Sequence, residues 1–168
     1  EEYDQEKDGK IAYETNVELK GIPRSSSFSF KDDMLIVGYF NFSKNGKLNV
    51  YEADENGIIK SDPVMSAKTD NMVQGVAYED NLLIISKSAG VFNSEILVFD
   101  STSKIGDDLK NLDITGDKAV LRMELPEKLE QLTIHDIGVY MIFESSAFAY
   151  RYMSFSQIDR VLSLRLDK

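Results

Sequence analysis

The chain contains no cysteine and no tryptophan, and it has only three prolines and one histidine among 168 residues. The absence of cysteine excludes disulfides, a thiolate nucleophile and cysteine-based zinc sites. A single histidine, His135, excludes a histidine-rich metal centre. No apolar run approaches the ~20 residues that span a membrane. We therefore expect no membrane insertion.

Basic residues are also scarce, because 29 acidic residues stand against 19 basic ones and give a formal net charge of -10. An acidic surface repels the phosphate backbone, so we expect no nucleic-acid partner. Apolar residues make up 42% of the chain, which is enough to bury a core of ordinary size. We predict one domain over residues 1–168, in which residues 1–10 form a flexible acidic segment.

The clearest pattern in the sequence is a repeat. Three segments each contain a short strand-like run, a polar turn with Asp, Asn or Gly, and a more apolar run, a pattern typical of hairpins. The apolar runs begin at Met34, Leu82 and Val139, and the first two starts are 48 residues apart. A further strand is expected after each hairpin, at residues 47–51, 95–99 and 160–164.

A fourth strand fits between the units, at residues 119–125, at 16–19 and, more weakly, at 64–67. Four short antiparallel strands repeated every ~40–60 residues are typical of β-propeller blades. The sequence therefore predicts an all-β, propeller-like chain of three blade units with about four strands each. A β-sandwich is the alternative, because its strands recur at similar spacing. The predicted units span about residues 21–69, 70–125 and 126–168.

Three units are fewer than the ~4–8 blades of propellers. Residues 11–19 resemble the outer strand of a blade whose inner strands are absent from this sequence. Two hypotheses follow: the chain is the C-terminal part of a larger propeller, or two chains complete one ring as a homodimer.

Several stretches are similar to a secreted bacterial β-propeller family of uncharacterised function. They are residues 72–77 (MVQGVA), 86–88 (SKS), 94–100 (SEILVFD), 125–126 (LP), 139–147 (VYMIFESSA) and 150–151 (YR). The resemblance covers roughly residues 70–151. It departs at Glu130 and Gln131, where the family would have a Glu-Gly pair. The resemblance implies a propeller fold and an extracellular or cell-surface location in a bacterium, and it implies no activity.

Polar side chains directly follow the apolar strand of the third unit. Glu144, Ser145 and Ser146 come first, and Tyr150 and Arg151 follow shortly after. Strand ends and connecting loops carry most functional residues in such folds. A carboxylate, two hydroxyls and a guanidinium there predict a binding site. The alternative is a Glu–Arg pair with serine hydroxyls that close the backbone of a turn.

Comparable places in the other units hold Ser86, Lys87 and Arg24, which we add as candidate binding residues. Adjacent residues of a strand point to opposite faces, so Ser86 and Lys87 cannot work as a Ser–Lys nucleophile pair. We predict no catalytic residue, no cofactor and no metal site. The acidic turn at residues 54–57 lacks the alternating ligands of a calcium loop.

Aromatic residues are numerous, with eight Tyr and nine Phe. Phe148, Tyr150, Tyr152 and Phe155 are dense near the end of the chain. We expect such side chains to fill the space between neighbouring sheets, and stacking on a sugar is the alternative.

Together these patterns predict an extracellular, non-enzymatic binding or interaction module. Its ligand is expected to be a small polar molecule or a partner protein. The alternative is a propeller enzyme of the metal-dependent lactonase or hydrolase kind. Such an enzyme needs several carboxylate ligands around a channel, and Glu144 is the first candidate for one of them.

Overall fold

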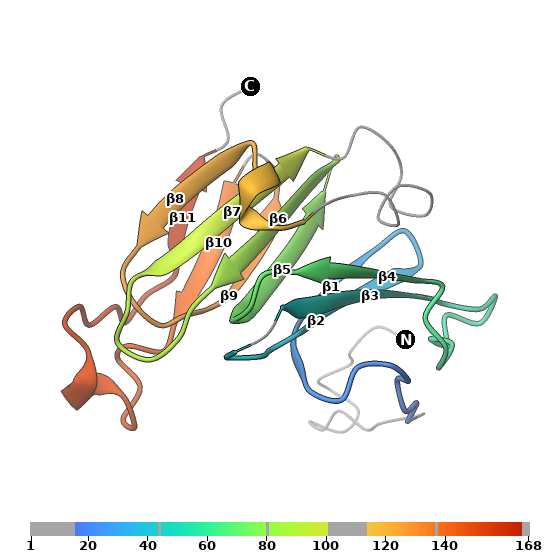
Figure 1. The fold of residues 1–168 in the computed structure, drawn as a ribbon, viewed down its shortest axis with the longest axis horizontal. Helices are drawn as coiled ribbons and strands as arrows, with labels where there is room; N and C mark the ends of the chain where they lie inside the picture. Colours follow the sequence, from blue (N-terminus) through green and yellow to red (C-terminus); the bar gives the residue numbers. More distant parts are fainter. Residues whose placement is uncertain (1–15, 44, 80, 101–113, 137, 166–168) are drawn as a thin grey trace, which may run out of the picture.

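A computed structural model describes residues 16–43, 45–79, 81–100, 114–136 and 138–165 of the chain. Its strands form three antiparallel sheets, which lie one after another along the molecule (Figure 1). The acidic segment predicted at residues 1–10 lies outside the described residues.

The first sheet consists of β1 (Ser25–Lys31), β2 (Met34–Tyr39), β3 (Gly46–Glu52) and β4 (Met65–Thr69). The second sheet consists of β5 (Val73–Glu79), β6 (Leu82–Lys87), β7 (Ser94–Asp100) and β8 (Leu121–Leu125). The third sheet consists of β9 (Leu129–His135), β10 (Gly138–Phe143) and β11 (Leu162–Arg165). Two short 3₁₀ turns complete the described elements, η1 (Gly116–Lys118) and η2 (Arg151–Met153).

The prediction of an all-β chain built from antiparallel sheets is confirmed. Each sheet is a meander in which every strand pairs with the next one in the sequence. Two details differ from the expectation. The third sheet has three described strands, and residues 16–19, expected to be a strand, pair with no described strand. A strand needs a neighbour for its backbone hydrogen bonds, and the sheet that would supply one for residues 16–19 is absent from the described chain.

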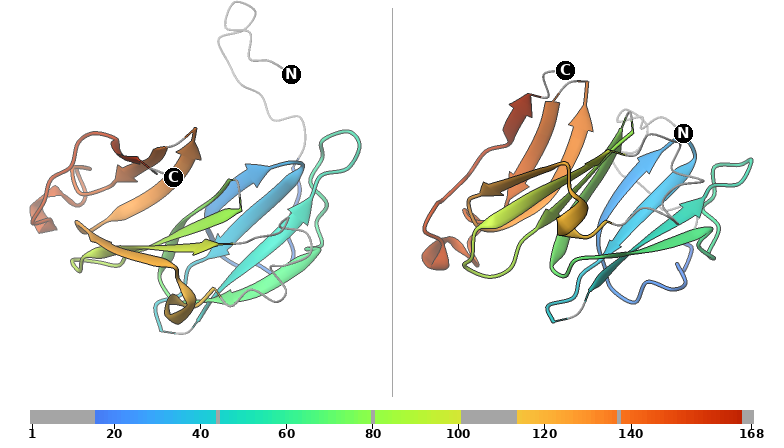
Figure 2. Two further views of the ribbon diagram at one scale, coloured as in Figure 1. Left: turned by 90° about the horizontal axis from the view of Figure 1, so that it is seen from above. Right: turned by 45° about the horizontal axis from the view of Figure 1, so that its top comes forward.

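The three sheets meet along their first strands, because β1 packs against β5 and β5 packs against β9. Figure 2 shows the sheets side by side and twisted relative to one another. Hairpin register makes Ile36, Ile84 and Tyr140 equivalent, since their strands begin at the paired positions Met34, Leu82 and Gly138. The sheets are thus three copies of one unit.

Equivalent positions face the same way in every sheet. Ile36 belongs to the core between the first and second sheets, and Ile84 to the core between the second and third. We call this side the forward face. The next residues, Ile85 and Met141, pack against the preceding sheet, on what we call the rear face. Among the described sheets, only the second has a neighbouring sheet on both faces.

The first strand of each sheet carries a β-bulge at the same place. Ser26, Gln74 and Glu130 have no partner in the pairing of the first strand with the second. Bulges bend a strand and increase its twist. Three equivalent bulges therefore give all three first strands the same bend where the sheets come together.

Small residues beside the bulge let the second and third sheets approach closely. Gly75 pairs with Ser86, and the side chain of Gln131 from the third sheet passes over this pair. A Cβ on Gly75 would lie 2.5 Å from Ser86 Oγ, 3.1 Å from Gln131 Oε1 and 3.2 Å from the backbone nitrogen of Leu132. Gly75 is therefore required by contact between sheets.

We predict that Gly75→Ala lowers the free energy of unfolding by about 1–3 kcal/mol, because the added methyl group overpacks this contact. Urea denaturation measures the loss. The matched variant is Ser86→Ala in the same background, which removes the nearest atom and should recover part of the stability. An unchanged midpoint for Gly75→Ala would contradict the close approach.

Candidate binding surface

The connections between the second and third strands of each sheet lie at one end of the molecule (Figure 1). We call residues 40–43, 88–93 and 144–161 the rim. Large aromatic side chains on the rim are exposed: Phe42 (68%), Phe92 (76%), Phe148 (76%), Tyr152 (82%) and Phe155 (87%). Side chains of this kind are usually buried away from water, so their accumulation makes the rim the candidate binding surface.

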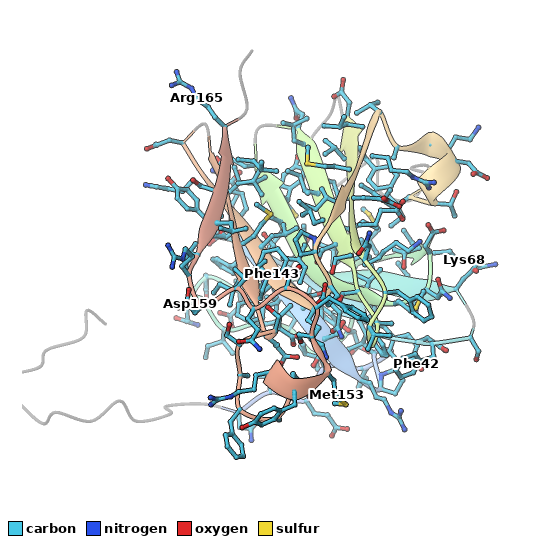
Figure 3. All side chains as sticks on the ribbon, turned by 90° about the vertical axis from the view of Figure 1, so that its left-hand side faces the viewer. Phe42, Lys68, Phe143, Met153, Asp159 and Arg165 are labelled. Carbon is cyan, nitrogen blue, oxygen red and sulfur yellow. The ribbon has the colours of Figure 1, made fainter. Side chains whose placement is uncertain are left out.

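The third part of the rim, residues 144–161, projects furthest from the sheets (Figures 1 and 2). We call it the projecting loop. It contains η2, and Figure 3 shows Met153 of this turn at the lower edge of the molecule. The corresponding connection in the second sheet is only residues 88–93. The additional residues are therefore not needed to join two strands of a sheet.

Two buried side chains hold the projecting loop. Ser145 Oγ accepts a hydrogen bond from the Ile158 backbone N–H at 2.9 Å, and a Glu127 carboxylate oxygen accepts one from Ser156 N–H at 2.9 Å. Burial opposes the charge of Glu127, but N–H donors of Ser156, Glu127 itself and Phe155 outweigh it and hold the pKa of Glu127 below its ordinary value. The loop is therefore fixed at its base.

Cations lie over the aromatic rings of the loop. The Arg151 guanidinium is 5.2 Å from the centre of the Phe148 ring and 5.9 Å from that of Tyr152. The Lys128 ammonium is 4.7 Å from the centre of the Tyr150 ring. These contacts orient the rings without covering them. The expectation that Phe148, Tyr152 and Phe155 fill space between sheets is thus wrong, because these side chains are exposed and none of the described sheets covers them.

Glu144 lies at the start of the loop beside Glu130, the bulge residue of the third sheet. Burial of Glu130, together with the charge of Glu144 and a hydrogen bond to it, raises the pKa of Glu130. Glu130 therefore takes up a proton more readily than an isolated carboxyl group does. Sequence reasoning named Glu144 but did not identify Glu130 as its neighbour.

The other predicted residues lie in different surroundings. Ser146 is half-buried at the base of the loop, and Arg24 is exposed beside Phe42 in the first part of the rim. Lys87, at the end of β6, forms ion pairs with Asp70, which follows β4, at 3.0 Å and with Glu95 of β7 at 3.4 Å. Ser86 is fully buried. The structure thus brings Glu144, Ser145, Ser146, Tyr150 and Arg151 into one loop and places Ser86 and Lys87 elsewhere.

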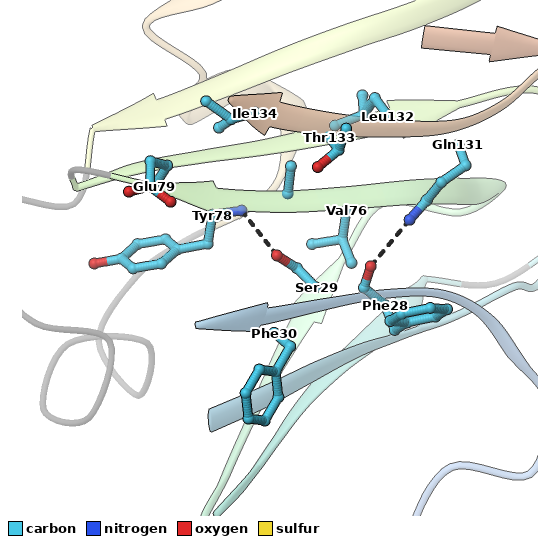
Figure 4. A pocket seen from close by; sticks show the side chains of 11 residues that line it. Phe28, Ser29, Phe30, Val76, Tyr78, Glu79, Gln131, Leu132, Thr133 and Ile134 are labelled. Carbon is cyan, nitrogen blue, oxygen red and sulfur yellow. Dashed lines mark hydrogen bonds between the residues drawn. The ribbon is translucent and has the colours of Figure 1, made fainter. Parts of the chain in front are cut away.

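A groove of about 300 Å³ lies along β1, β5 and β9 (Figure 4). Side chains from neighbouring sheets cross it: Gln131 Nε2 donates to the Phe28 carbonyl at 2.9 Å, and Tyr78 N–H donates to Ser29 Oγ at 3.2 Å. These bonds satisfy backbone groups on free strand edges. The groove is therefore a join between sheets, and the rim is the better candidate for binding.

Two negative observations apply to the described part of the chain. No three of its His, Cys, Asp and Glu side chains come together as possible metal ligands. None of its helical turns has the length and apolar character needed to cross a membrane.

No family model matches the chain, and no curated protein matches it either. Two solved structures show partial likeness. The crystal structure of the computationally designed Ika8 protein is 12% identical, with a TM-score of 0.41 over 89% of this chain, which spans only 48% of that structure. The computationally designed Ika4 protein is also 12% identical, with a TM-score of 0.36 over 93% of this chain and 100% of that one. Likeness at this level carries no argument about fold or function.

We predict that Glu127→Gln costs about 2 kcal/mol at pH 7, because the N–H groups of residues 155 and 156 lose their charged acceptor. The pKa of Glu127 is lowered on folding, so this stability is present above about pH 4.5 and is lost as the pH falls through the folded-state pKa. Thermal melts at pH 7 and pH 3 measure the change.

Trypsin cleavage after Arg151 should also be faster in this variant. Glu55→Gln, at an exposed turn, is the matched control and should change neither measurement. Equal cleavage rates in the Glu127→Gln variant and the unmodified protein would contradict the proposed role of Glu127 in holding the loop.

We predict that the stability contributed by Glu130 depends on pH in the opposite sense to that contributed by Glu127, and Glu130→Gln tests this. The pKa of Glu130 is raised on folding, so Glu130 contributes most stability below about pH 4.5, and this contribution is lost as the pH rises through its folded-state pKa. The neutral amide avoids that loss, so the variant should melt about 1–3 °C higher at pH 7 and equally at pH 4. A lower melting temperature at pH 7 would show that the charged carboxylate stabilises the fold.

Proposed function

We propose that this chain is a binding module that holds a partner protein through its projecting loop. The observation that carries the proposal is the set of exposed aromatic rings at Phe148, Tyr152 and Phe155, on a loop fixed by buried hydrogen bonds. Aromatic residues and arginine are the residues most enriched at the energetic centres of protein interfaces. A loop whose base is already ordered also loses less conformational entropy on binding.

The charge of this surface supports a particular kind of partner. Within the projecting loop, Arg151 and Arg160 are balanced by Glu144 and Asp159, and Arg160 pairs with Asp159 at 3.1 Å. Arg151 is the cation that lies over the exposed rings of Phe148 and Tyr152, in a chain whose net charge is -10. The best match is a segment with apolar side chains beside carboxylates, which would pack on the rings and pair with Arg151.

The other predicted functions have weaker support. A small polar ligand would need a concave site, whereas the aromatic rings project outward. A metal-dependent lactonase or hydrolase would need several convergent ligands, and no three His, Cys, Asp and Glu side chains come together among the described residues. An extracellular or cell-surface location in a bacterium remains our proposal and rests on the family resemblance of residues 70–151.

Selection of random peptides displayed on phage tests the proposal while the partner is unidentified. The phage library is first depleted of peptides that bind a Phe148→Ser/Tyr152→Ser/Phe155→Ser variant. The remaining phage are then selected on the immobilised, unmodified chain. We expect enriched peptides with Asp or Glu beside apolar residues, whose synthetic forms bind the unmodified chain at least ten times more tightly than the variant.

Arg151→Gln should weaken the same peptides several-fold, because it removes the cation while the rings remain. Phe92→Ser, which alters a separate part of the rim, is the control and should leave binding unchanged. Peptides that bind the triple variant equally well, or the absence of enrichment over it, would overturn the assignment of the projecting loop.

A further inference from the structure

The third sheet ends in a strand edge and an apolar face. Of the described strands, only β10 pairs with β11, whereas the first and second sheets each have a fourth strand. On the forward face of the third sheet, Tyr140 is 38% exposed and Ile142 is 54% exposed. Their equivalents in the second sheet, Ile84 and Ser86, are both fully buried, and Ile84 packs in the core with the third sheet. The forward face of the third sheet thus carries apolar side chains like those buried between the other sheets, but no described sheet packs on it.

The rear face of the first sheet, at the other end of the stack, also carries exposed apolar side chains. Phe28 is 64% exposed and Phe30 is 55% exposed. Register makes Phe28 equivalent to Val76, which is buried in the core between the first and second sheets. It also makes Phe28 equivalent to Leu132, buried between the second and third sheets. Two phenylalanines thus stand where the other sheets pack against the sheet before them.

Residues 17–21 lie where the fourth strand of a preceding sheet would lie. Met65 begins β4 and Leu121 begins β8, each eight residues before the first strand of the next sheet, and Val17 stands eight residues before Ser25. Met65 packs on the sheet that follows it.

Leu19 and Ile22 pack in the same way on the rear face of the first sheet, against Val37 and Tyr51. The Tyr51 hydroxyl also donates a hydrogen bond to the Lys20 carbonyl at 2.7 Å. Residues 17–21 are therefore already placed beside the space that a preceding sheet would occupy.

We propose that this space is filled by the third sheet of a second copy of the chain. In that arrangement residues 17–21 pair with the free edge of β11 and complete the sheet of the second copy. Phe28 and Phe30 then pack on the forward face of that sheet, which carries Tyr140 and Ile142. The contact continues the sheet-on-sheet packing that already repeats twice within one chain.

In a two-fold dimer, the rear face of each first sheet and the forward face of each third sheet are both covered. Each copy offers one rear face with residues 17–21 and one forward face with β11, so two copies form two identical contacts and leave neither end open. Three sheets from each copy make a closed ring of six, within the ~4–8 blades of propellers.

The register of the new strand pair follows from the repeat. Val50 pairs with Met65 in the first sheet, and Val98 pairs with Leu121 in the second. Ser163, which pairs with Tyr140, takes the position of Val50 and Val98. Val17 takes the position of Met65 and Leu121. Val17 of one copy should therefore lie directly opposite Ser163 of the other, with Cβ atoms about 4.5–5.5 Å apart.

The absence of cysteine makes this register directly testable. We expect Val17→Cys/Ser163→Cys to form a disulfide between chains under mild oxidation, seen as a dimer band on a non-reducing gel. The single variants, and Val17→Cys/Arg165→Cys with its register shifted by two residues, are the controls and should cross-link at least ten-fold less. A disulfide within one chain, or equal yields for the shifted pair, would overturn the proposal.

Charge variants at the two faces test the ring independently. Phe28→Glu/Phe30→Glu and Tyr140→Glu/Ile142→Glu should each sediment mainly as monomers, whereas the unmodified chain sediments as a dimer. A mixture of the two variants retains one intact contact and should yield a one-to-one heterodimer. A monomeric unmodified chain, or a dimer that survives the Tyr140→Glu/Ile142→Glu change, would contradict a ring closed by these faces.

Discussion

In the second and third sheets, the rear face leaves water by packing on the forward face of the sheet before it, and most of the structure follows from this contact. Apolar side chains on both faces of a short sheet cannot be buried by that sheet alone. Sheets therefore have to stack, and the equivalent bulges at Ser26, Gln74 and Glu130 give each first strand the bend seen where they meet. Gly75 and Ser86 then allow the third sheet to approach. Of the described sheets, only the second has another sheet on both faces. The rings of Phe28 and Phe30 on the rear face of the first sheet are therefore exposed, because no described sheet packs against them.

The stacking of the sheets determines where the rim loops lie, although the rim residues are not themselves in the sheets. A meander places every connection between its second and third strands at one end, so three stacked sheets bring three such loops together. Side chains there are free of packing constraints, which explains how the third loop can be long and carry exposed rings. Its base remains tied to the sheets by Glu127 and Ser145, both buried. A rigid base with an exposed aromatic tip is suited to recognition of another protein.

The hairpins of all three sheets could be predicted from the sequence, because alternating apolar runs and Asp, Asn or Gly turns are local signals. The cluster from Glu144 to Arg151 was also found, since polar residues follow an apolar strand. The bulges and the neighbour of Glu144 could not be predicted, because they depend on register between strands. The burial of the aromatic residues was predicted wrongly for a related reason. Phe148 and Phe155 are of a residue type that usually lies in a core, and they are exposed because the long loop carries them away from the sheets.

Native-state hydrogen exchange tests most directly the claim that the two open faces of the stack and the outer edge of β11 are completed by another copy of the chain. The informative amides are those of β1 and those of β11 that point away from β10, compared with the fully buried segment at Leu83, Ile84 and Ile85 in β6. The account predicts protection of β1 and β11 of the same order as in β6, lost on dilution below the dissociation constant of the ring. Exchange in β1 and β11 that is orders of magnitude faster than in β6 at every protein concentration would contradict it.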